Sequence, residues 1–335
     1  YLKMSKFFCP DNCKVTVAVA VGIGVVTAVT AGYLYKKKLD HSPPKKWRRV
    51  GELADLIVYP IKSCGPIRLN EVQCNILGAQ VGHLRDRVFM IITTEGEFIT
   101  ARSHPKCVLI QPRFDGDKMI ISAPEMLDIE VDINKLYDLK TRKIVVWDHA
   151  ADVVECDEEV DKWISRFLLN KDTGMRLVFH PSTLPTRNVH KKSKGFPDLT
   201  KIDTGSLQDE TPFMLMNEAS VAELNTRLKD SVTHLQFRPN FLVKGPTTAF
   251  EEDNWKWIKI GNEVIFRNVK LCGRCIFTNI HPETGLRNPE QQPLKTLKSY
   301  RMVPNAGDSP ILGIHLGVRV PGKISLGDAV YVGEN

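Results

Sequence analysis

The stretch Leu271-Cys272-Gly273-Arg274-Cys275-Ile276-Phe277-Thr278 is followed closely by His281-Pro282-Glu283-Thr284-Gly285. It offers two soft sulfur ligands and a fixed positive charge between a strand-like run and a turn. A guanidinium between two cysteines argues against a purely apolar site, because a buried arginine needs a partner or an anion. Our working hypothesis, which the rest of the sequence tests, is that Cys275 is the metal-binding thiolate of an enzyme.

Spacing alone leaves three other interpretations of the two cysteines open. A structural zinc site takes four ligands, and no second C-x-x-C or H-x-H pair follows at zinc-finger spacing. A thioredoxin-like redox pair begins a helix in an alternating strand–helix unit, whereas the flanks here are strand-like. Two buried core cysteines are the third interpretation. The eight cysteines of the chain are scattered, which is unlike a disulfide framework and indicates a reducing compartment.

The positive charge of the chain is concentrated at its N-terminus. Residues 1–50 carry ten Lys and Arg side chains and two acids, a net of +8, and the whole chain has a net of +7. Residues 51–335 therefore carry 36 basic and 37 acidic side chains and are nearly neutral. We expect no broad surface for a phosphate backbone there, and so no nucleic-acid partner.

An uncharged run over residues 15–35 is long enough for a helix across the hydrocarbon layer of a membrane, about 30 Å thick. Tyr33 and Tyr35 stand where aromatic residues gather at a membrane surface. We predict a short N-terminal segment at 1–14 and a retained transmembrane signal-anchor at 15–35, with a buried soluble helix as the alternative.

The residues around this span predict its orientation. Seven Lys and Arg side chains follow it within 15 residues and three precede it, so the C-terminal bulk should face the cytosol. A span of Val, Ala, Gly and Thr suits the mitochondrial outer membrane, and the endoplasmic reticulum membrane is the alternative. Residues 36–50 are interpreted as a basic linker that contacts membrane lipid.

Short β-branched and aromatic runs separated by turn signals fill most of the remaining chain. Helices are expected at 157–169, capped by Asp157, after the capping residue Asn217, and at 293–300. Hairpins are expected around turns at 94–97, 115–117 and 261–262. The expected strands lie at 53–59, 88–93, 98–100, 108–114, 118–122, 143–147, 175–179, 213–216, 241–244, 255–260, 264–271 and 311–332.

Residues 181–201 lose periodicity and are rich in Pro, Lys, Ser and Thr, so we place a domain boundary there. Strands do not alternate regularly with helices, and a doubly wound sheet is therefore not expected. The predicted fold class is mixed α+β, mostly β. It combines the N-terminal transmembrane anchor with a β-barrel-like domain at 51–180 and a second β-barrel domain at 181–335.

Several ordered motifs resemble one known family. C-x-R-C followed by P-x-T-G resembles the signature of MOSC domains, which bind molybdenum cofactor. Tyr59-Pro60-Ile61-Lys62-Ser63-Cys64 resembles the motif that opens the β-barrel domain preceding MOSC in one branch of the family. Three further segments match: Leu84-Arg85-Asp86-Arg87, Phe237-Arg238-Pro239-Asn240 and Leu297-Lys298-Ser299-Tyr300-Arg301. With the anchor, they make the chain similar to the mitochondrial amidoxime-reducing components, with MOSC N-terminal and MOSC domains at 51–180 and 181–335.

The resemblance implies a molybdenum cofactor (Mo-molybdopterin) whose metal is bound by the second cysteine of C-x-R-C, here Cys275. Thiolates suit this soft metal, and Cys272 is expected only to pack. Guanidinium, ammonium, hydroxyl and amide groups suit the polar, anionic remainder of the cofactor. The implied cofactor-binding residues are Lys62, Ser63, Arg87, Asp209, Thr211, Arg238, Asn240, Gly273 and Arg274.

Three positions qualify the resemblance. Asp209-Glu210-Thr211-Pro212 resembles the D-T-S-P segment beside the metal, with Glu210 in place of a hydroxyl residue, so we expect backbone contacts there. Asp209 is also assigned a catalytic role, to steer or supply a proton. His281 replaces an Asp, and His315 stands where relatives have an aromatic residue. Each either tunes the substrate pocket or lies on a surface loop, and we favour the surface loop.

The resemblance implies a molybdenum-dependent oxidoreductase that reduces small N-hydroxylated compounds: amidoximes, hydroxylamines and N-oxides. The chain has no flavin, haem or nicotinamide motif, so an external donor is expected, and the family implies cytochrome b5 with NADH-cytochrome b5 reductase. One alternative is a sulfur-carrier or cofactor-binding MOSC module without reductase activity, although no pyridoxal-phosphate domain is present. A membrane-tethered adaptor with a dead site is the other, and the intact C-x-R-C argues against it.

Overall fold

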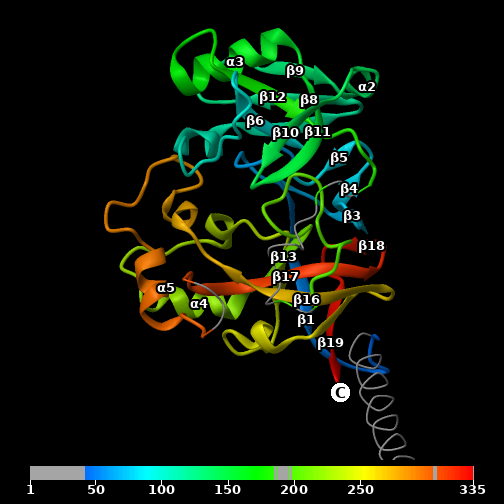
Figure 1. The fold of residues 1–335 in the computed structure, drawn as a ribbon. Helices are drawn as coiled ribbons and strands as arrows, with labels where there is room; N and C mark the ends of the chain where they lie inside the picture. Colours follow the sequence, from blue (N-terminus) through cyan, green and yellow to red (C-terminus); the bar gives the residue numbers. More distant parts are fainter. Residues whose placement is uncertain (1–41, 185–186, 188–195, 197, 305–307, 335) are drawn as a thin grey trace, which may run out of the picture. The chain divides into compact units, whose positions relative to one another are not determined.

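Strands from both ends of the described chain close a seven-stranded barrel that carries the C-x-R-C segment (Figure 1). The computed structural model describes residues 42–184, 187, 196, 198–304 and 308–334, and Lys45–Asn335 form one compact unit. The barrel strands are β1 (Lys46–Val58), β13 (Phe213–Asn217), β14 (Phe241–Lys244), β15 (Trp257–Ile260), β16 (Val264–Gly273), β17 (Ile311–Val320) and β19 (Ala329–Glu334). They run in the order β14-β13-β17-β16-β15-β19-β1, and β1 pairs with β14 to close the circle.

The interior of the barrel is filled with side chains, as expected for a barrel of this size. The rings of Phe213, Phe241 and Phe266 meet there with centroids 5.2–5.5 Å apart. Leu53 and Leu56 of β1 are also fully buried in this cluster. A ligand must therefore bind outside the barrel, where its strands end.

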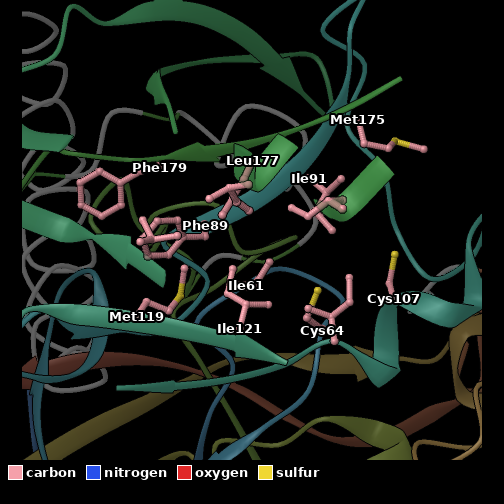
Figure 2. Close-up of a cluster of buried hydrophobic side chains, with 14 of the residues drawn as sticks. Ile61, Cys64, Phe89, Ile91, Cys107, Met119, Ile121, Met175, Leu177 and Phe179 are labelled. Carbon is pink, nitrogen blue, oxygen red and sulfur yellow. The ribbon is translucent and has the colours of Figure 1, made fainter. Parts of the chain in front are cut away.

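Three smaller sheets hold most of the remaining strands. One contains β10 (Arg142–Val146), β11 (His149–Glu155), β12 (Met175–Phe179) and β6 (Phe89–Thr93). The second contains β18 (Gly322–Ser325), β3 (Glu71–Asn75), β4 (Gly78–Val81) and β5 (Leu84–Arg85). The third contains β7 (Gln111–Asp115), β8 (Lys118–Ser122) and β9 (Ile129–Asp132). The short strand β2 (Ile67–Arg68) pairs with β1. Figure 2 shows Phe89, Phe179 and Met119 converging in a second core.

The helices are short. They are α2 (Ile133–Tyr137), α3 (Glu158–Leu169), α4 (Glu218–Asn225), α5 (Leu294–Tyr300) and the 3-10 turns η1 (Pro105–Leu109), η3 (His234–Phe237), η4 (Glu251–Asn254) and η5 (Ile276–Asn279). Asp157 caps α3 by accepting a hydrogen bond from the backbone of Glu159 at 2.8 Å. Asn217 caps α4 in the same way. The predicted helices are thus confirmed.

The mostly β class is confirmed, and several details differ from expectation. Residues 98–100 form only an isolated bridge, Ile92 to Phe98, instead of a strand. Residues 108–109 lie in η1. Residues 46–50, predicted as linker, belong to β1, where Lys46 pairs with Glu334.

Strands are also exchanged across the predicted domain boundary. Residues 51–58, assigned to the first domain, pair with β14 and β19 of the second half. In return, β18 of the second half pairs with β3 of the first. The domain limits at 51–180 and 181–335 remain predictions.

The predicted membrane span at 15–35 lies outside the described residues, as does the segment 1–14. Within the part of the chain that the structure describes, no helix is long and apolar enough to cross a membrane.

A buried carboxyl group at the η4 turn predicts a pH-dependent stability. Glu252 is fully buried and accepts a hydrogen bond from Ser220 at 2.8 Å, while its Oε1 has no partner among the described residues. Burial raises the pKa of Glu252 from 4.5 to about 7, although the bond from Ser220 opposes the shift. Because the folded state holds this proton more tightly, the free energy of unfolding falls as pH rises from about 4.5 through 7.

Glu252→Gln should remove this loss. Above pH 7 we expect the variant to have a larger free energy of unfolding than the wild type, by up to about 3 kcal/mol, and so to unfold at higher urea concentration. Below pH 4.5 the two proteins should be equally stable. Urea unfolding at pH 4.5 and pH 8.5 measures the difference. The same exchange at exposed Glu263 is the control and should leave the pH dependence unchanged. A gain for Glu252→Gln of equal size at both pH values would contradict the assignment.

Candidate active site

All ten predicted site residues line one cavity of about 550 Å³. They come from segments far apart in the sequence: Lys62 and Ser63, Arg87, Asp209 and Thr211, Arg238 and Asn240, and Gly273, Arg274 and Cys275. The structure thus brings together the residues that the motifs had selected, while their individual roles remain predictions.

Cys275 lies where β16 ends and η5 begins. The backbone N–H of Arg274 donates to Pro310 at 2.8 Å, which continues the pairing of β16 with β17. One residue later the chain turns, and Thr278 donates from both its N–H and its hydroxyl to the carbonyl of Cys275, at 3.1 and 2.9 Å. The sulfur is therefore held on a strand end fixed by backbone bonds, at the cavity wall.

Arg274 is anchored in the fold. Its Nε donates to the carbonyl of Leu312 at 2.7 Å and its Nη1 to the carbonyl of Phe237 at 2.9 Å. Gly313, with φ of +77°, makes room for this guanidinium, because a Cβ there would lie 3.2 Å from Nη2 and 2.7 Å from a carbonyl oxygen. These carbonyls occupy much of its donor capacity, and binding of an anion by Arg274 remains a prediction.

Lys62 and Asp209 form an ion pair at the cavity wall. The Lys62 ammonium is buried and donates to Asp209 and to the carbonyl of Leu207. Burial lowers the pKa of Lys62 to about 8, and Asp209 limits the shift. Burial alone would raise the pKa of Asp209, but Lys62 and Arg102 outweigh it and hold that pKa well below its usual value. An ionised carboxylate is suited to steering a substrate or a proton and less suited to supplying one.

Three of the predicted binding residues have a left-handed backbone. The φ angles are +69° at Ser63, +47° at Arg87 and +56° at Arg238. Residues other than glycine seldom adopt this region, and such strain gathers at functional sites. The surrounding structure therefore fixes unfavourable conformations at positions whose side chains line the cavity.

The two arginines enclose one tyrosine. The guanidinium carbons of Arg87 and Arg238 lie 4.5 and 3.9 Å from the centroid of the Tyr59 ring. Burial lowers the pKa of Arg238 to about 10. Its buried Nη2 has no hydrogen-bond partner among the residues described in the structure. An unsatisfied guanidinium nitrogen in a cavity wall calls for an anion, such as the phosphate of a bound cofactor.

Asn240 and Thr211 are bonded mainly within the protein. Asn240 donates to Asp86 and to the carbonyl of Ile57, both at 3.1 Å, and accepts from the N–H of Met214 at 3.1 Å. The Thr211 hydroxyl donates to the carbonyl of Phe213 at 3.1 Å. Both side chains support the cavity wall through these bonds.

Comparison with known proteins agrees with this geometry. The chain matches the MOSC N-terminal beta barrel domain over residues 50–171 and the MOSC domain over residues 203–331. "Mitochondrial amidoxime-reducing component 1" of Danio rerio is 37% identical over 319 residues, which cover 94% of this chain and 91% of the relative. This chain belongs to the family of mitochondrial amidoxime-reducing components.

Mammalian members of the amidoxime-reducing family match over similar lengths. "Mitochondrial amidoxime reducing component 2" of Bos taurus is 35% identical over 292 residues, 86% of this chain and 84% of the relative. "Mitochondrial amidoxime-reducing component 1" of Homo sapiens is 35% identical over 290 residues, 85% of this chain and 84% of the relative.

The donor set fits the molybdenum cofactor that MOSC domains bind. Within the described residues, no three His, Cys, Asp or Glu side chains group around a possible metal position. Cys275 is a single thiol in a cation-rich cavity, which suits a metal that arrives with other ligands of its own. Lys62 and the unsatisfied Arg238 would face the anionic part of the cofactor. In this member of the amidoxime-reducing family, Cys275 would therefore supply the protein ligand.

The expectation for His315 was wrong, whereas His281 does lie exposed in a loop. His315 is in β17 and lines the cavity, with 15% of its side chain exposed. Its Nδ1 is 2.9 Å from the hydroxyl of Thr211 and its Nε2 is 3.2 Å from Glu210, which also pairs with Lys270. His315 lies within a nearly continuous apolar run of β17, and its place inside the strand predicted at 311–332 was the signal against a surface loop.

The network around His315 also includes Cys272, which packs in the neighbouring hydrophobic cluster. Burial lowers the pKa of His315, but Cys272 and Glu210 outweigh it and raise that pKa. Burial raises the pKa of the Cys272 thiol, but Arg274 and His315 outweigh it and lower that pKa. Two of the three departures from the family pattern, Glu210 and His315, contact each other at 3.2 Å.

Among the cavity residues that the motifs missed, two contact Asp209. Arg102 lies with Nη1 3.7 Å from the sulfur of Cys275 and 3.8 Å from a carboxylate oxygen of Asp209. Trp147 donates from its indole N–H to Asp209 at 2.8 Å. Both come from the first half of the chain, where no motif pointed to them. Trp147 was expected only as the last residue of a strand at 143–147, and the hairpin that it forms with Asp148 is seen only in the structure.

Proposed function

We propose that this protein is a molybdenum-cofactor-dependent reductase of small N-hydroxylated compounds, such as amidoximes, hydroxylamines and N-oxides. The observation that carries the proposal is Cys275, whose thiol reaches a cavity walled by lysine and arginine side chains from separate segments. The MOSC match supports the cofactor, and the names of the relatives support the reaction class.

The residues of the cavity would have different roles in the reaction. Reduction of an N–OH group takes up two electrons and two protons and releases water. When bound, the cofactor supplies the electrons. Cys275 would ligate the metal, and Arg238 and Arg87 would bind the anionic part of the cofactor. Asp209, held ionised by Lys62 and Arg102, would accept a hydrogen bond from the substrate N–OH and orient it.

Elemental analysis and a reduction assay test the proposal together. The purified full chain should contain stoichiometric molybdenum and should reduce benzamidoxime to benzamidine when given a low-potential chemical reductant. Labile sulfur on Cys275 without molybdenum and without reduction would overturn the proposal and favour the sulfur-carrier alternative. Molybdenum with no reduction of any N-hydroxylated compound would overturn the reaction class and leave the cofactor in place.

We further propose that residues 15–35 anchor the protein in the mitochondrial outer membrane with the catalytic part in the cytosol, and that cytochrome b5 and NADH-cytochrome b5 reductase supply electrons. The uncharged run and its basic flank support the anchor. The word mitochondrial in the names of the relatives supports the organelle. Protease treatment of intact mitochondria should remove the catalytic part, and NADH-driven reduction should require both partners.

A further inference from the structure

A strained hairpin tip lies at the cavity. Only Trp147 and Asp148 connect β10 to β11, and their φ angles are +49° and +65°. Two-residue turns of this kind favour Asn-Gly or Asp-Gly, because both central residues need positive φ. A bulky tryptophan is unfavourable there, so the strain suggests that the indole has a use at this position.

Three contacts fix the indole of Trp147. Its N–H donates to Asp209 at 2.8 Å, its ring lies 5.0 Å from that of Phe98 in an edge arrangement, and the guanidinium of Arg102 stacks 4.7 Å from its centroid. Nevertheless 41% of Trp147 is exposed, and the side chain lines the same cavity as Cys275. A large aromatic surface is thus held rigid and left open to a ligand.

Arg102 extends this surface to the sulfur. Its guanidinium contacts both the indole and Cys275, whose Sγ is 3.7 Å from Nη1. Indole and guanidinium are both flat, and both stack well on aromatic or conjugated groups. We refer to Trp147 and Arg102 together as the stacking wall.

We propose that the stacking wall determines substrate specificity, by selecting planar conjugated N-hydroxylated compounds such as aryl amidoximes over aliphatic ones. This inference rests on the proposed function of the cavity. An aromatic ring on the wall would place its N–OH substituent beside Asp209 and the Cys275 sulfur. An alkyl amidoxime has the same reacting group and no ring to stack, so the wall contributes to one substrate and not to the other.

The pair benzamidoxime and acetamidoxime isolates this contribution. In the loaded full-length enzyme, Trp147→Leu should raise KM for benzamidoxime about five- to tenfold and leave its kcat within about twofold, because stacking is uniform binding. KM for acetamidoxime should not change. Trp147→Phe keeps a ring and loses the N–H bond to Asp209, and it should retain most of the preference.

A purely structural role of Trp147 would give a different pattern. If the tryptophan only held the hairpin through Asp209, Trp147→Leu and Trp147→Phe would impair both substrates equally, and that result would overturn the proposal. Trp47→Leu is the matched control. Trp47 lies on β1, 5.3 Å from the ammonium of Lys259, and does not line the cavity. This variant should leave the preference for benzamidoxime intact.

Binding without turnover separates this proposal from the reaction itself. Equilibrium dialysis of benzamidoxime and acetamidoxime against the full-length protein, with no reductant, should show tighter binding of the aryl compound in the wild type and in Trp47→Leu. The advantage should be lost in Trp147→Leu. If the protein reduces neither compound but shows this pattern, the proposed function is wrong and the stacking wall stands. Equal binding of the two compounds by the wild type would contradict the proposed role of the stacking wall, whether or not the protein reduces them.

Discussion

Cys275→Ala should abolish reduction of benzamidoxime and strip most of the molybdenum from the purified protein. The thiol is the sulfur ligand that the MOSC signature implies, and alanine leaves the metal without any protein ligand at this position. Loss of residues that merely support a ligand typically costs 10–100-fold, so loss of the ligand should exceed about a hundredfold in activity. Metal content by elemental analysis and initial rates with a chemical reductant measure both effects.

Cys272→Ala is the matched control for this experiment. Cys272 is three residues earlier on the same strand end, lines the same cavity and is 5% exposed. It packs with Met214 and Leu312, so its loss should cost some stability but leave molybdenum bound. Full activity and an intact metal content in Cys275→Ala would contradict the proposed role of Cys275 as the metal ligand. Loss of the metal only in Cys272→Ala would reverse the assignment of the ligand.

Local features of the fold were predictable from the sequence. The α3 helix follows from its cap at Asp157 and from apolar residues at helical spacing such as Val160 and Trp163, because both signals lie within one short segment. The hairpin of β15 and β16 follows from Gly261 between two β-branched runs. In both cases the physical cause is contained in neighbouring residues.

Pairing between distant segments was not predictable in this way. β1 joins β19 and β14, more than 180 residues away, and no local pattern indicates which edges meet. Lys46 was therefore predicted to be part of a basic linker, although its backbone pairs with Glu334. Register of this kind depends on the hydrophobic face of the whole sheet.

The candidate site shows the same division. Lys62, Arg238 and Cys275 were selected because each lies in a motif of the family, and the fold then placed them on one cavity. Trp147 and Arg102 belong to no motif. They reach the cavity because the β10–β11 hairpin of the first half extends to Asp209, a contact that only the tertiary structure reveals.

A second large effect is expected at Asp86, which joins the two halves of the cavity wall. Its carboxylate is fully buried and accepts bonds from four residues: from the N–H of Tyr59 at 2.9 Å, from Arg87 at 2.7 and 2.9 Å, from Asn240 at 3.1 Å and from Gln208 at 3.4 Å. Asp86→Asn keeps the shape but replaces one acceptor by a donor and removes the charge opposite Arg87. Breaking a buried pair in this way costs about 3–5 kcal/mol.

Urea unfolding should therefore show a large drop in midpoint for Asp86→Asn at an unchanged slope, together with weaker retention of molybdenum, because Arg87 and Asn240 lose the group that positions them. Asp117→Asn is the control, since that carboxylate is 58% exposed and its ion pair with His83 lies at the surface. A loss below about 1 kcal/mol for Asp86→Asn would mean that the neighbouring donors find other acceptors. The cavity wall would then be held by Tyr59 between its two arginines, and not by the carboxylate beneath them.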